Sequence, residues 1–551
     1  MSVRGALYAV TVHGDRAVCA APDGVRFDGA VADLVRFVEQ TDASVADLRW
    51  VWWAAAEAAT PLVRAGLHLR RCWDLTEAHR LLVGGFDAGA DEIWAAAAGL
   101  DPAERPAPSS GDLFDLRPDD DAVVGSDGYL NPSCLQPDWR SAHLVDLARL
   151  ALVTADRQGA LLAARPHGVS TATSESGAAL LCVELTEHGL PIDRPVLERL
   201  ITATAGPRPR DEAHADQIRA ARDELVLQHV PGRGTTDLRN PAHVRDLLRS
   251  LGVRVDDTRA WHLEPYRDLH PVVGALLDWR KAERIATTYG WSWLDRFVGT
   301  DDRLRGAWTA CDGGAGRMTA GAGLHSLPTP LRPGVAAAPD HVLVRADLGQ
   351  VEPRVLAVVS ADPDFAAATA QDDLYATVAQ QLHLDRPAAK IAVLAAMYGQ
   401  TSGPAADALQ RMERTYPRAL RYLRAAAERG EHGEPVVTYG GRLVRSRLAA
   451  DQAGRRAIGR FTRNAVVQGA AAEFFKAWAL TVRDAVRPFG GRIVLCLHDE
   501  LLVHAPASYA TETAQAVDDA LQAAARRWTG GAPVRFVADL KVVQRWSEAK
   551  G

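Results

Sequence analysis

The chain has 551 residues, of which 47% are hydrophobic and 24% charged, and its formal net charge is −6. This composition is typical of a globular protein, and the length allows about three to four domains. The sequence has neither a run of about 18 apolar residues nor a signal-peptide pattern, which argues against a membrane partner and against secretion and predicts a cytoplasmic location. The cysteines form no CxxC pair, so we expect buried thiols instead of zinc ligands or disulfides: Cys19, Cys72, Cys134, Cys182, Cys311 and Cys496.

Residues 1–100 predict an α/β domain, because strand-like and helical segments alternate there. The strand-like segments are ALYAVTV and RAVCAAP, and the helical ones are AVADLVRFVEQ, AEAATPLVRAG and TEAHRLLVGG. Residues 101–140 begin with a stretch rich in Pro, Ser and Asp, which indicates a linker or an insertion. We expect residues 141–175 to form the C-terminal helical part of this first domain.

The rest of the chain is expected to be mainly helical as far as Arg305. Strands are predicted again around Val342 and around Val494, with a long helical insertion between them. The first of these strands, HVLVRA from His341, ends at Asp347, and a helix is expected after a turn at Gly349.

A hairpin is predicted at residues 495–506, LCLHDELLVHAP, with His498, Asp499 and Glu500 at its bend. A simple polar turn would explain this pattern. A metal site is the alternative, because Mg²⁺ binds through one or two carboxylates together with substrate phosphates. Asp347, at the carboxyl end of its strand, can meet this hairpin across one sheet. Two such carboxylates can hold two metal ions roughly 3.5 to 4 Å apart, as in-line phosphoryl transfer requires.

Between the two aspartates, the sequence LDRPAAKIAVLAAMYGQ predicts a helix from Arg386 to Tyr398. Asp385 is suited to cap this helix, Pro387 to begin it and Gly399 to end it.

One face of this helix is expected to carry two cations, an apolar side chain and an aromatic ring, which recur every four residues: Arg386, Lys390, Leu394 and Tyr398. Such a face suits a triphosphate and a base or sugar stacked beside it. An amphipathic helix with solvated cations is the alternative. Lysine is scarce in this chain, and unlike arginine it can lose its proton in a usable pH range, which singles out Lys390. The segment 410–463 is rich in arginine and predicts a phosphate-binding surface, with a solvated helix face as the alternative.

Together these segments resemble the family A DNA polymerases, the polymerase I type. The first palm motif corresponds to Asp347, Gln350, Glu352 and Arg354, the fingers helix to Arg386, Lys390, Tyr398 and Gly399, and the third motif to His498, Asp499 and Glu500. The primer-side signature corresponds to Gly316, Arg317, Met318, Leu324 and Pro328, and a template-side segment to Arg460, Asn464, Gln468, Gly469 and Lys476. The resemblance spans roughly residues 184–550, and so many motifs in order make it specific.

The resemblance implies a multidomain right-hand polymerase over 176–551, with the thumb at 184–300, the palm at 301–361 and 480–551, and the fingers at 362–479. It implies catalysis by Asp347, Asp499, Glu500, Lys390 and Arg386, with two Mg²⁺ ions, or Mn²⁺ in their place, held by Asp347, Leu348 and Asp499. The nucleotide would be bound by Gln350, Glu352, Arg386, Lys390, Leu394, Tyr398 and His498, and the DNA by Arg317, Arg460, Asn464 and Gln468. The implied partners are primer-template DNA and deoxynucleoside triphosphates, and we expect a monomer.

Residues 1–175 resemble the proofreading 3′–5′ exonuclease of the same family, an RNase H-like domain, in outline only. The first strand lacks an Asp-x-Glu pair, an active site would need another acid near Ala58, and Thr154 stands where an acid is expected. Asp74 and Asp156 remain as isolated acids. We therefore expect a scaffold without nuclease activity.

The chain also departs from the family beside the nucleotide. Leu394 and Ala395 stand where an aromatic residue and a glycine are usual, and Leu348 and Gly349 replace a Tyr-Ser pair. These changes predict altered selection between deoxy and dideoxy sugars, while Glu352 still opposes a ribose 2′-hydroxyl. This combination suits DNA repair or lesion-tolerant synthesis.

An RNA polymerase-like nucleotidyltransferase and an inactive DNA-binding module are the alternatives. Glu352 argues against the former and the retained catalytic residues against the latter.

Overall fold

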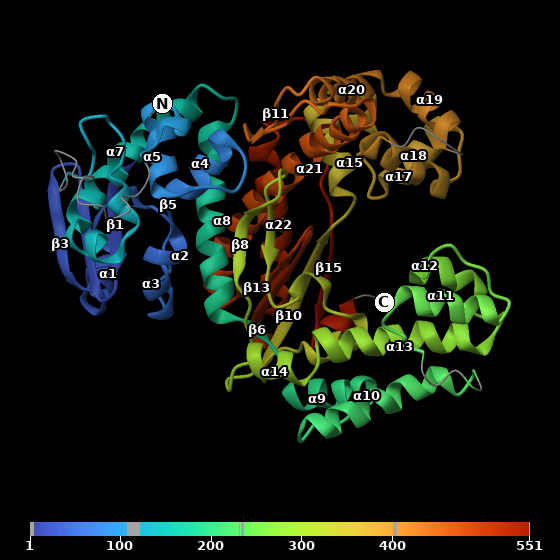
Figure 1. Ribbon diagram of the computed structural model, residues 1–551. Helices are drawn as coiled ribbons and strands as arrows, with labels where there is room; N and C mark the ends of the chain where they lie inside the picture. The colour runs from blue at the N-terminus through green and yellow to red at the C-terminus, as the bar shows by residue number, and fades with distance from the viewer. Residues whose placement is uncertain (1–4, 107–121, 231, 233–235, 400–404, 550–551) are drawn as a thin grey trace. The chain divides into compact units, whose positions relative to one another are not determined.

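The computed structural model describes residues 5–106, 122–230, 232, 236–399 and 405–549 (Figure 1). The chain divides into two compact units. The first unit comprises Met1–Gly189, Ala307–Ala320 and Val344–Val542, and the second comprises Leu190–Gly306, Gly321–Leu343 and Val543–Gly551.

The first unit begins with a five-stranded mixed sheet in the order β3-β2-β1-β4-β5, which confirms the predicted α/β character. Its strands are β1 (Ala6–His13), β2 (Arg16–Ala21), β3 (Gly24–Ala30), β4 (Leu48–Trp52) and β5 (Cys72–Asp74). The strand β1 pairs antiparallel with β2 and parallel with β4. The accompanying helices are α1 (Val31–Ser44), α2 (Ala55–Ala58), α3 (Thr60–Arg64), α4 (Leu75–Val83), α5 (Ala90–Ala98), α6 (Pro137–Ala142) and α7 (Leu144–Ala163).

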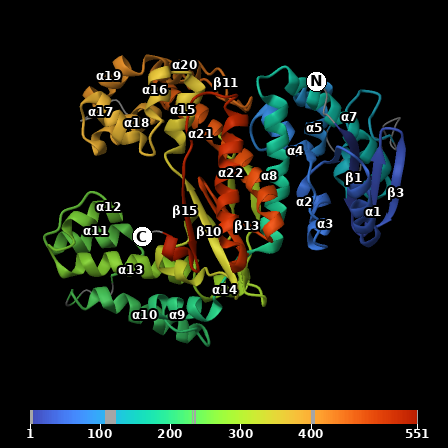
Figure 2. The ribbon, with the colours of Figure 1, turned by 180° about the vertical axis from the view of Figure 1, so that it is seen from behind.

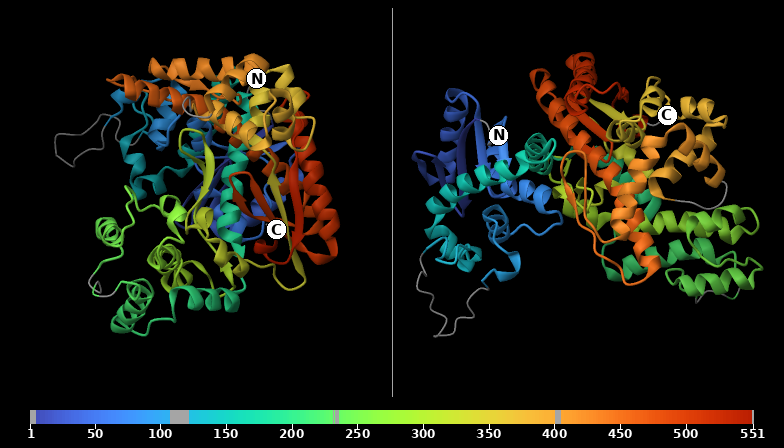
Figure 3. Two further views of the ribbon diagram at one scale, coloured as in Figure 1. Left: turned by 90° about the vertical axis from the view of Figure 1, so that its right-hand side faces the viewer. Right: turned by 90° about the horizontal axis from the view of Figure 1, so that it is seen from above.

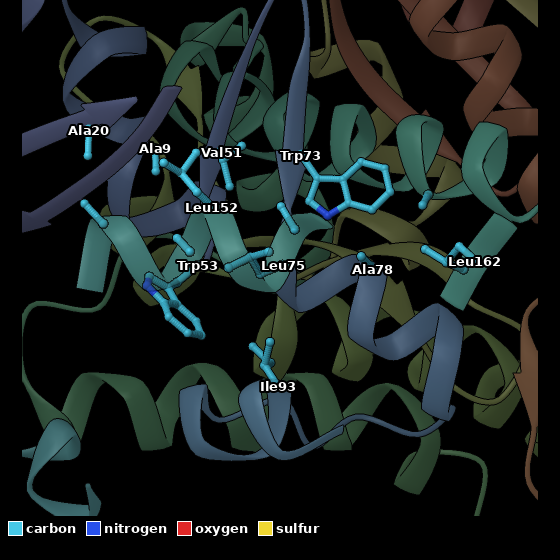
Figure 4. Packing of buried hydrophobic residues seen from close by; sticks show 14 of the residues in the cluster. Ala9, Ala20, Val51, Trp53, Trp73, Leu75, Ala78, Ile93, Leu152 and Leu162 are labelled. Atoms are coloured by element: carbon cyan, nitrogen blue, oxygen red, sulfur yellow. The ribbon is translucent and has the colours of Figure 1, made fainter. Parts of the chain in front are cut away.

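Both faces of this sheet are buried. Successive side chains of a strand point to opposite faces, and here they pack in two separate hydrophobic clusters. Ala9 and Val51 pack in one cluster with residues of α4 and α7, among them Leu75 and Leu152 (Figure 4). Their neighbours Val10 and Trp50 pack in the other cluster, with Leu34 of α1. This double burial explains the apolar runs of β1 and β4.

A long helix, α8 (Gly168–His188), links this domain to the rest of the first unit through buried ion pairs. Glu175 contacts Lys476 at 2.6 Å and Arg442 at 2.7 Å, and all three side chains are almost fully buried. Glu184 pairs with Arg483 in the same way. Because breaking a buried ion pair leaves an uncompensated charge, these contacts hold the elements in one arrangement.

The second sheet of the first unit has the strand order β13-β14-β10-β15 (Figure 2). Its strands are β10 (His341–Leu348), β13 (Arg492–Leu497), β14 (Glu500–Pro506) and β15 (Ala538–Val543), and α22 (Ala510–Trp528) packs against β14. The predicted hairpin is therefore confirmed as β13 and β14, and β14 lies beside β10 in the sheet. A further hairpin of β8 (Trp308–Asp312) and β9 (Arg317–Ala320) begins earlier than the strands expected near Val342.

A largely helical segment lies between β10 and β13, as the sequence predicts. Its helices are α15 (Val351–Ser360), α16 (Pro363–Ala368), α17 (Leu374–Leu382), α18 (Arg386–Tyr398), α19 (Ala405–Thr415), α20 (Pro417–Glu431) and α21 (Gln452–Ala485), with a small hairpin of β11 (Val436–Val437) and β12 (Leu443–Val444). The helix α20 packs along α21 (Figures 1 and 3).

The second unit is mainly helical. Its helices are α9 (Arg194–Ala205), α10 (Glu212–Leu227), α11 (Pro241–Ser250), α12 (Ala260–Leu263), α13 (Pro271–Thr288) and α14 (Trp291–Phe297). Apolar residues of α10, α11 and α13 form its core, among them Val226, Leu247 and Leu276. Two short strands of this unit, β6 (Leu190–Pro191) and β7 (Arg303–Leu304), pair antiparallel.

Several predicted limits differ from the observed elements. The limits at 175/176 and 479/480 fall inside α8 and α21, so a continuous helix crosses each of them. The expected linker contains α6 and a short 3₁₀ helix (Pro132–Leu135) in its described second half, and residues 107–121 lie outside the described residues. All six cysteines are buried free thiols, as expected. Among the described helices, none combines the length and the apolar character that crossing a bilayer requires.

Candidate active site

The two predicted catalytic aspartates lie at the ends of neighbouring strands. Asp347 is the penultimate residue of β10, and Asp499 occupies the two-residue turn between β13 and β14 together with His498, whose φ is 52°. The main-chain amide of Leu348 donates a hydrogen bond of 2.9 Å to the carbonyl of Asp499, and the amide of Gly349 donates one of 2.9 Å to Val537. These bonds hold the end of β10 on both sides.

Glu500 differs from Asp499 in its environment. It is the first residue of β14 and pairs with Leu497 across the hairpin. The prediction that Glu500 lies in the bend itself is therefore wrong. Its side chain is buried. Burial of a carboxylate requires a compensating partner. Arg345 supplies one, because its Nη2 donates to Glu500 at 3.1 Å.

Arg345 is a site residue that the sequence analysis missed. It stands two residues before Asp347, so both side chains project from the same face of β10. Its guanidinium forms ion pairs with Asp347, with Glu500 and, at 3.0 Å, with Asp539 of β15. Burial alone would lower the pKa of Arg345, but the three carboxylates raise it overall. The available signal was a charged residue inside the apolar strand HVLVRADL.

The helix α18 has the predicted bounds and caps. The Asp385 side chain accepts a hydrogen bond from the amide of Ala388, and Gly399 ends the helix with a φ of 72°. Arg386, Lys390 and Tyr398 are exposed and Leu394 is half-buried, whereas Ala389 and Val393 are buried. The four predicted residues therefore lie on the accessible side of the helix.

A pocket of about 190 Å³ brings most of the predicted nucleotide site together. It is lined by Arg317, Leu348, Gln350, Val351, Glu352, Pro353, Tyr375, Leu394, Gln468, Ala471, Ala472, Phe475, His498 and Asp499. Two aromatic liners, Tyr375 and Phe475, were not predicted. Asp347, Glu500, Arg386, Lys390, Tyr398, Arg460 and Asn464 are not among the lining residues.

Within this pocket the positive charge of Arg317 acts on both Glu352 and His498. The Glu352 carboxylate accepts hydrogen bonds of 3.1 Å from Arg317 Nη2 and 3.1 Å from the Tyr398 hydroxyl. The bond from the Tyr398 hydroxyl connects Tyr398 to the pocket. Burial lowers the pKa of His498, and the charge of Arg317 lowers it further. A neutral imidazole can both donate and accept a hydrogen bond.

Arg386 is connected to the pocket through Asp373, a second residue that we missed. Asp373 Oδ2 accepts a hydrogen bond of 2.5 Å from Arg386 Nε, and Oδ1 accepts one of 3.0 Å from the Gln350 side chain. Gln350 in turn accepts from the amide of Leu374 at 2.8 Å. Burial raises the pKa of Asp373, but the hydrogen bonds from Arg386 and Gln350 lower it, and the pKa is lowered overall.

Arg354 organises the loop that carries Asp373. Its buried guanidinium donates to five main-chain carbonyls, of Gly349, Thr369, Gln371, Asp372 and Arg535. Burial lowers the pKa of Arg354 to about 10, which leaves it charged at neutral pH. This residue of the first palm motif thus positions main chain and lies away from the pocket.

The predicted DNA-binding residues other than Arg317 lie on α21. Arg460 is exposed, Asn464 is half-buried, and Gln468 reaches the pocket. They recur every four residues and so follow one side of the helix towards the pocket. Arg442, from the arginine-rich segment, is buried against Glu175 and does not contribute to an exposed basic surface.

The donor chemistry at the two aspartates fits Mg²⁺. Asp347 and Asp499 offer carboxylate oxygens, and Leu348 can offer only its main-chain carbonyl because its side chain is apolar; all three are hard donors. Across the described ranges, no three His, Cys, Asp or Glu side chains converge in the manner of a metal site. This arrangement suits an ion held by one or two carboxylates and completed by substrate phosphates and water.

Among the described residues of the first domain, no three acids form a comparable metal site. Asp74 is buried and caps α4, where it accepts hydrogen bonds from the amides of Glu77 at 2.9 Å and Ala55 at 2.7 Å. Burial and the neighbouring Glu77 raise its pKa. Asp156 is exposed on α7, and Thr154 is buried and donates to the carbonyl of Leu150. Asp74 is therefore accounted for as a helix cap.

Comparison with known proteins identifies the family of the chain. The sequence model of DNA polymerase family A matches residues 251–548. DNA polymerase I of Chloroflexus aurantiacus is 28% identical over 339 residues, which cover 56% of this chain and 35% of that protein. DNA polymerase I of Deinococcus radiodurans is 29% identical over 286 residues, or 46% of this chain and 30% of that protein. DNA polymerase theta of Caenorhabditis elegans is 25% identical over 311 residues, which cover 52% of this chain and 19% of that protein. The chain thus spans about a third or less of these relatives.

Among solved structures, the POL domain of Pol1 from M. smegmatis, in complex with DNA primer-template and dNTP, has the same fold. The TM-score is 0.68 at 21% sequence identity, and the match covers 100% of this chain and 97% of that one. The family match covers more than half of the 551 residues. The chain therefore belongs to DNA polymerase family A.

Proposed function

We propose that the chain is a template-directed DNA polymerase that extends a primer 3′ end with deoxynucleoside triphosphates. The observation that carries this proposal is the hydrogen bond between Leu348 and Asp499, which brings the two strand ends with Asp347 and Asp499 together beside the pocket. Family membership, and the three DNA polymerases named above as relatives, favour it over an RNA polymerase-like enzyme.

In this proposal Asp347, Asp499 and the Leu348 carbonyl hold the metal ions. Two Mg²⁺ ions, when bound, activate the primer hydroxyl and neutralise charge on the phosphates. Glu500 supports the site from β14 through Arg345. His498, whose pKa is lowered, can hydrogen-bond beside the primer terminus.

The cations of α18 bind the triphosphate. Arg386 and Lys390 lie one turn apart on the exposed side of the helix, so both can contact the departing pyrophosphate and stabilise its charge. Lys390 is also suited to donate a proton to the leaving group, since an ammonium can do so and a guanidinium cannot.

The pocket between β10, α15 and α18 selects the sugar and base. Glu352 is held by Arg317 and Tyr398, which supports the proposed role of its carboxylate in opposing a ribose 2′-hydroxyl. Leu394 and Tyr375 provide the apolar wall. Arg460, Asn464 and Gln468 follow the template-primer along α21. A wall of leucine in place of an aromatic ring supports the proposal of a repair or lesion-tolerant role.

We also assign the thumb to the region 184–300, the palm to 301–361 and 480–551, and the fingers to 362–479, with α8 and α21 shared across the limits. The first domain, in which Asp74 caps a helix and Asp156 is exposed, serves as a scaffold without nuclease activity. That the chain acts as a cytoplasmic monomer stays a prediction from sequence.

Primer extension with purified protein tests the proposal. A labelled primer annealed to a longer template, supplied with Mg²⁺ and either deoxy- or ribonucleoside triphosphates, should be extended with the former only and not at all in EDTA. Lys390→Ala should slow a single incorporation while primer-template affinity is unchanged. Extension with ribonucleotides alone would favour the RNA polymerase-like alternative, and no extension with either would refute the proposal.

A further inference from the structure

Arg345 places a fixed positive charge among the acids of the proposed metal site. Its side chain is only 4% exposed, and its two terminal nitrogens reach three carboxylates on three adjacent strands: Asp347, Glu500 and Asp539. Asp347 is a proposed metal ligand and Glu500 a supporting acid, while Asp539 is 60% exposed. The guanidinium therefore already neutralises part of the negative charge of Asp347, the charge that would attract a divalent ion.

We propose that Arg345 is an internal counter-cation that weakens divalent-ion binding in the nucleotide-free protein and makes ion loading depend on the incoming triphosphate. The reason is competition for one carboxylate, since a charge already paired with Arg345 attracts an approaching ion less. The guanidinium also reduces repulsion among the clustered acids, which keeps them in place without metal.

A nucleotide changes this balance because its phosphates bring negative charge and further oxygen ligands. Mg²⁺ takes much of its coordination from substrate phosphates, so an ion that Asp347 holds weakly alone is held strongly with the triphosphate. Arg345 is not among the residues that line the pocket, and it acts through Asp347 and Glu500, so it is a positioning residue. The inference rests on the proposed function for its metal, but its readout does not require catalysis.

Binding of Mn²⁺ to the nucleotide-free full chain, measured by electron paramagnetic resonance, tests the inference. Arg345→Gln should lower the Kd for Mn²⁺ at least tenfold and should lower the melting temperature in EDTA, with Mn²⁺ restoring it. Arg345→Lys keeps the charge but has one donor group in place of the two-pronged guanidinium, so its Kd should fall less. Arg492→Gln, which removes an exposed arginine at the start of β13 in the same sheet, should leave both values unchanged.

The outcomes separate the two proposals. If Arg345→Gln and Arg345→Lys both bind Mn²⁺ with the wild-type Kd, Arg345 is not a counter-cation of this site, whatever the polymerase activity. If Arg345→Gln does not fold, Arg345→Lys decides alone, and a Kd equal to that of the wild type overturns the inference. A tightened Kd in a protein that extends no primer supports the inference and refutes the proposed function.

Discussion

Leu348 donates its main-chain amide to the carbonyl oxygen of Asp499 at 2.9 Å, although the two residues are 151 positions apart in the chain. This bond joins the end of β10 to the turn of the β13–β14 hairpin. It joins the strand end that carries Asp347 to the turn that carries Asp499, the two acids on which the proposed chemistry depends.

Asp373 forms an ion pair with Arg386, the proposed triphosphate ligand, and such an exposed pair is worth about 0 to 1 kcal/mol. Asp373→Asn keeps a side-chain oxygen to cap α17 but removes the charge that competes with phosphate for Arg386. We expect the KM for deoxynucleotides to fall by up to about fivefold, with kcat little changed. Steady-state single-nucleotide incorporation measures this.

The matched control is Asp372→Asn, which removes the same charge one residue earlier, where the acid pairs with Arg535 instead. Its KM should equal that of the wild type. Equal KM values for all three proteins would show that Asp373 does not restrain Arg386.

Sugar selection should depend on Leu394 and Glu352, which line the pocket on different elements. Leu394→Phe should change the preference between deoxy- and dideoxynucleotides about tenfold to a few hundredfold, since apolar packing is worth about 1 to 3 kcal/mol of discrimination. Glu352→Ala should raise ribonucleotide incorporation. The measurement is kcat/KM for each nucleotide, and unchanged ratios in both variants would contradict this assignment of the pocket.

Glu473 should make the protein less stable as pH rises. It is buried on α21, and burial raises its pKa from 4.5 to about 7, although hydrogen bonds from Thr438 and the charge of Arg442 oppose the shift. Between these values the folded state holds a proton that the unfolded state has released, so the free energy of unfolding falls as pH rises through this window. At about 1.4 kcal/mol per pKa unit, the loss is on the order of 3 kcal/mol.

Glu473→Gln keeps a neutral side chain of the same shape and should remove most of this loss. Urea titrations at pH 5 and pH 8 measure it, with the exposed Glu428→Gln as the control that should behave like the wild type. An equal pH dependence in Glu473→Gln and wild type would show that this carboxyl does not titrate in the window.

The first domain should show no 3′–5′ exonuclease activity, because Asp74 is a buried cap and Asp156 is an exposed residue on another helix. Asp74→Ala should instead lower the free energy of unfolding by about 1 to 2 kcal/mol, the usual cost of losing a helix cap. Asp156→Ala should change it by less than about 0.5 kcal/mol. Digestion of a mismatched primer by the wild type, abolished in either variant, would disprove this prediction.

The elements with local sequence signals were predicted well. The bounds of α18 follow from Asp385, Pro387 and Gly399, and those of the β13–β14 hairpin from two apolar runs around a polar turn. The proposed limits at 175/176 and 479/480 fall inside the long helices α8 and α21, where the sequence has no capping signal, and they stay predictions.

The residues that we missed at the site are defined by contacts between distant segments. Asp373 meets Arg386 and Gln350 only after α15 and α17 pack, and Arg345 finds Glu500 on another strand. Lys476 likewise lies in a motif of the family, yet it pairs with Glu175, 301 residues away. Neither periodicity nor composition indicates such partners, because they depend on tertiary packing.

Single-turnover primer extension by Asp347→Asn and Asp499→Asn tests the central claim most directly. Each variant should bind primer-template with nearly the wild-type Kd and should lose extension at least about a hundredfold, because a bound metal contributes several kcal/mol to such a transition state. Asp340→Asn, in the turn before β10, should extend at the wild-type rate. Extension near the wild-type rate in Asp347→Asn or Asp499→Asn would contradict the account.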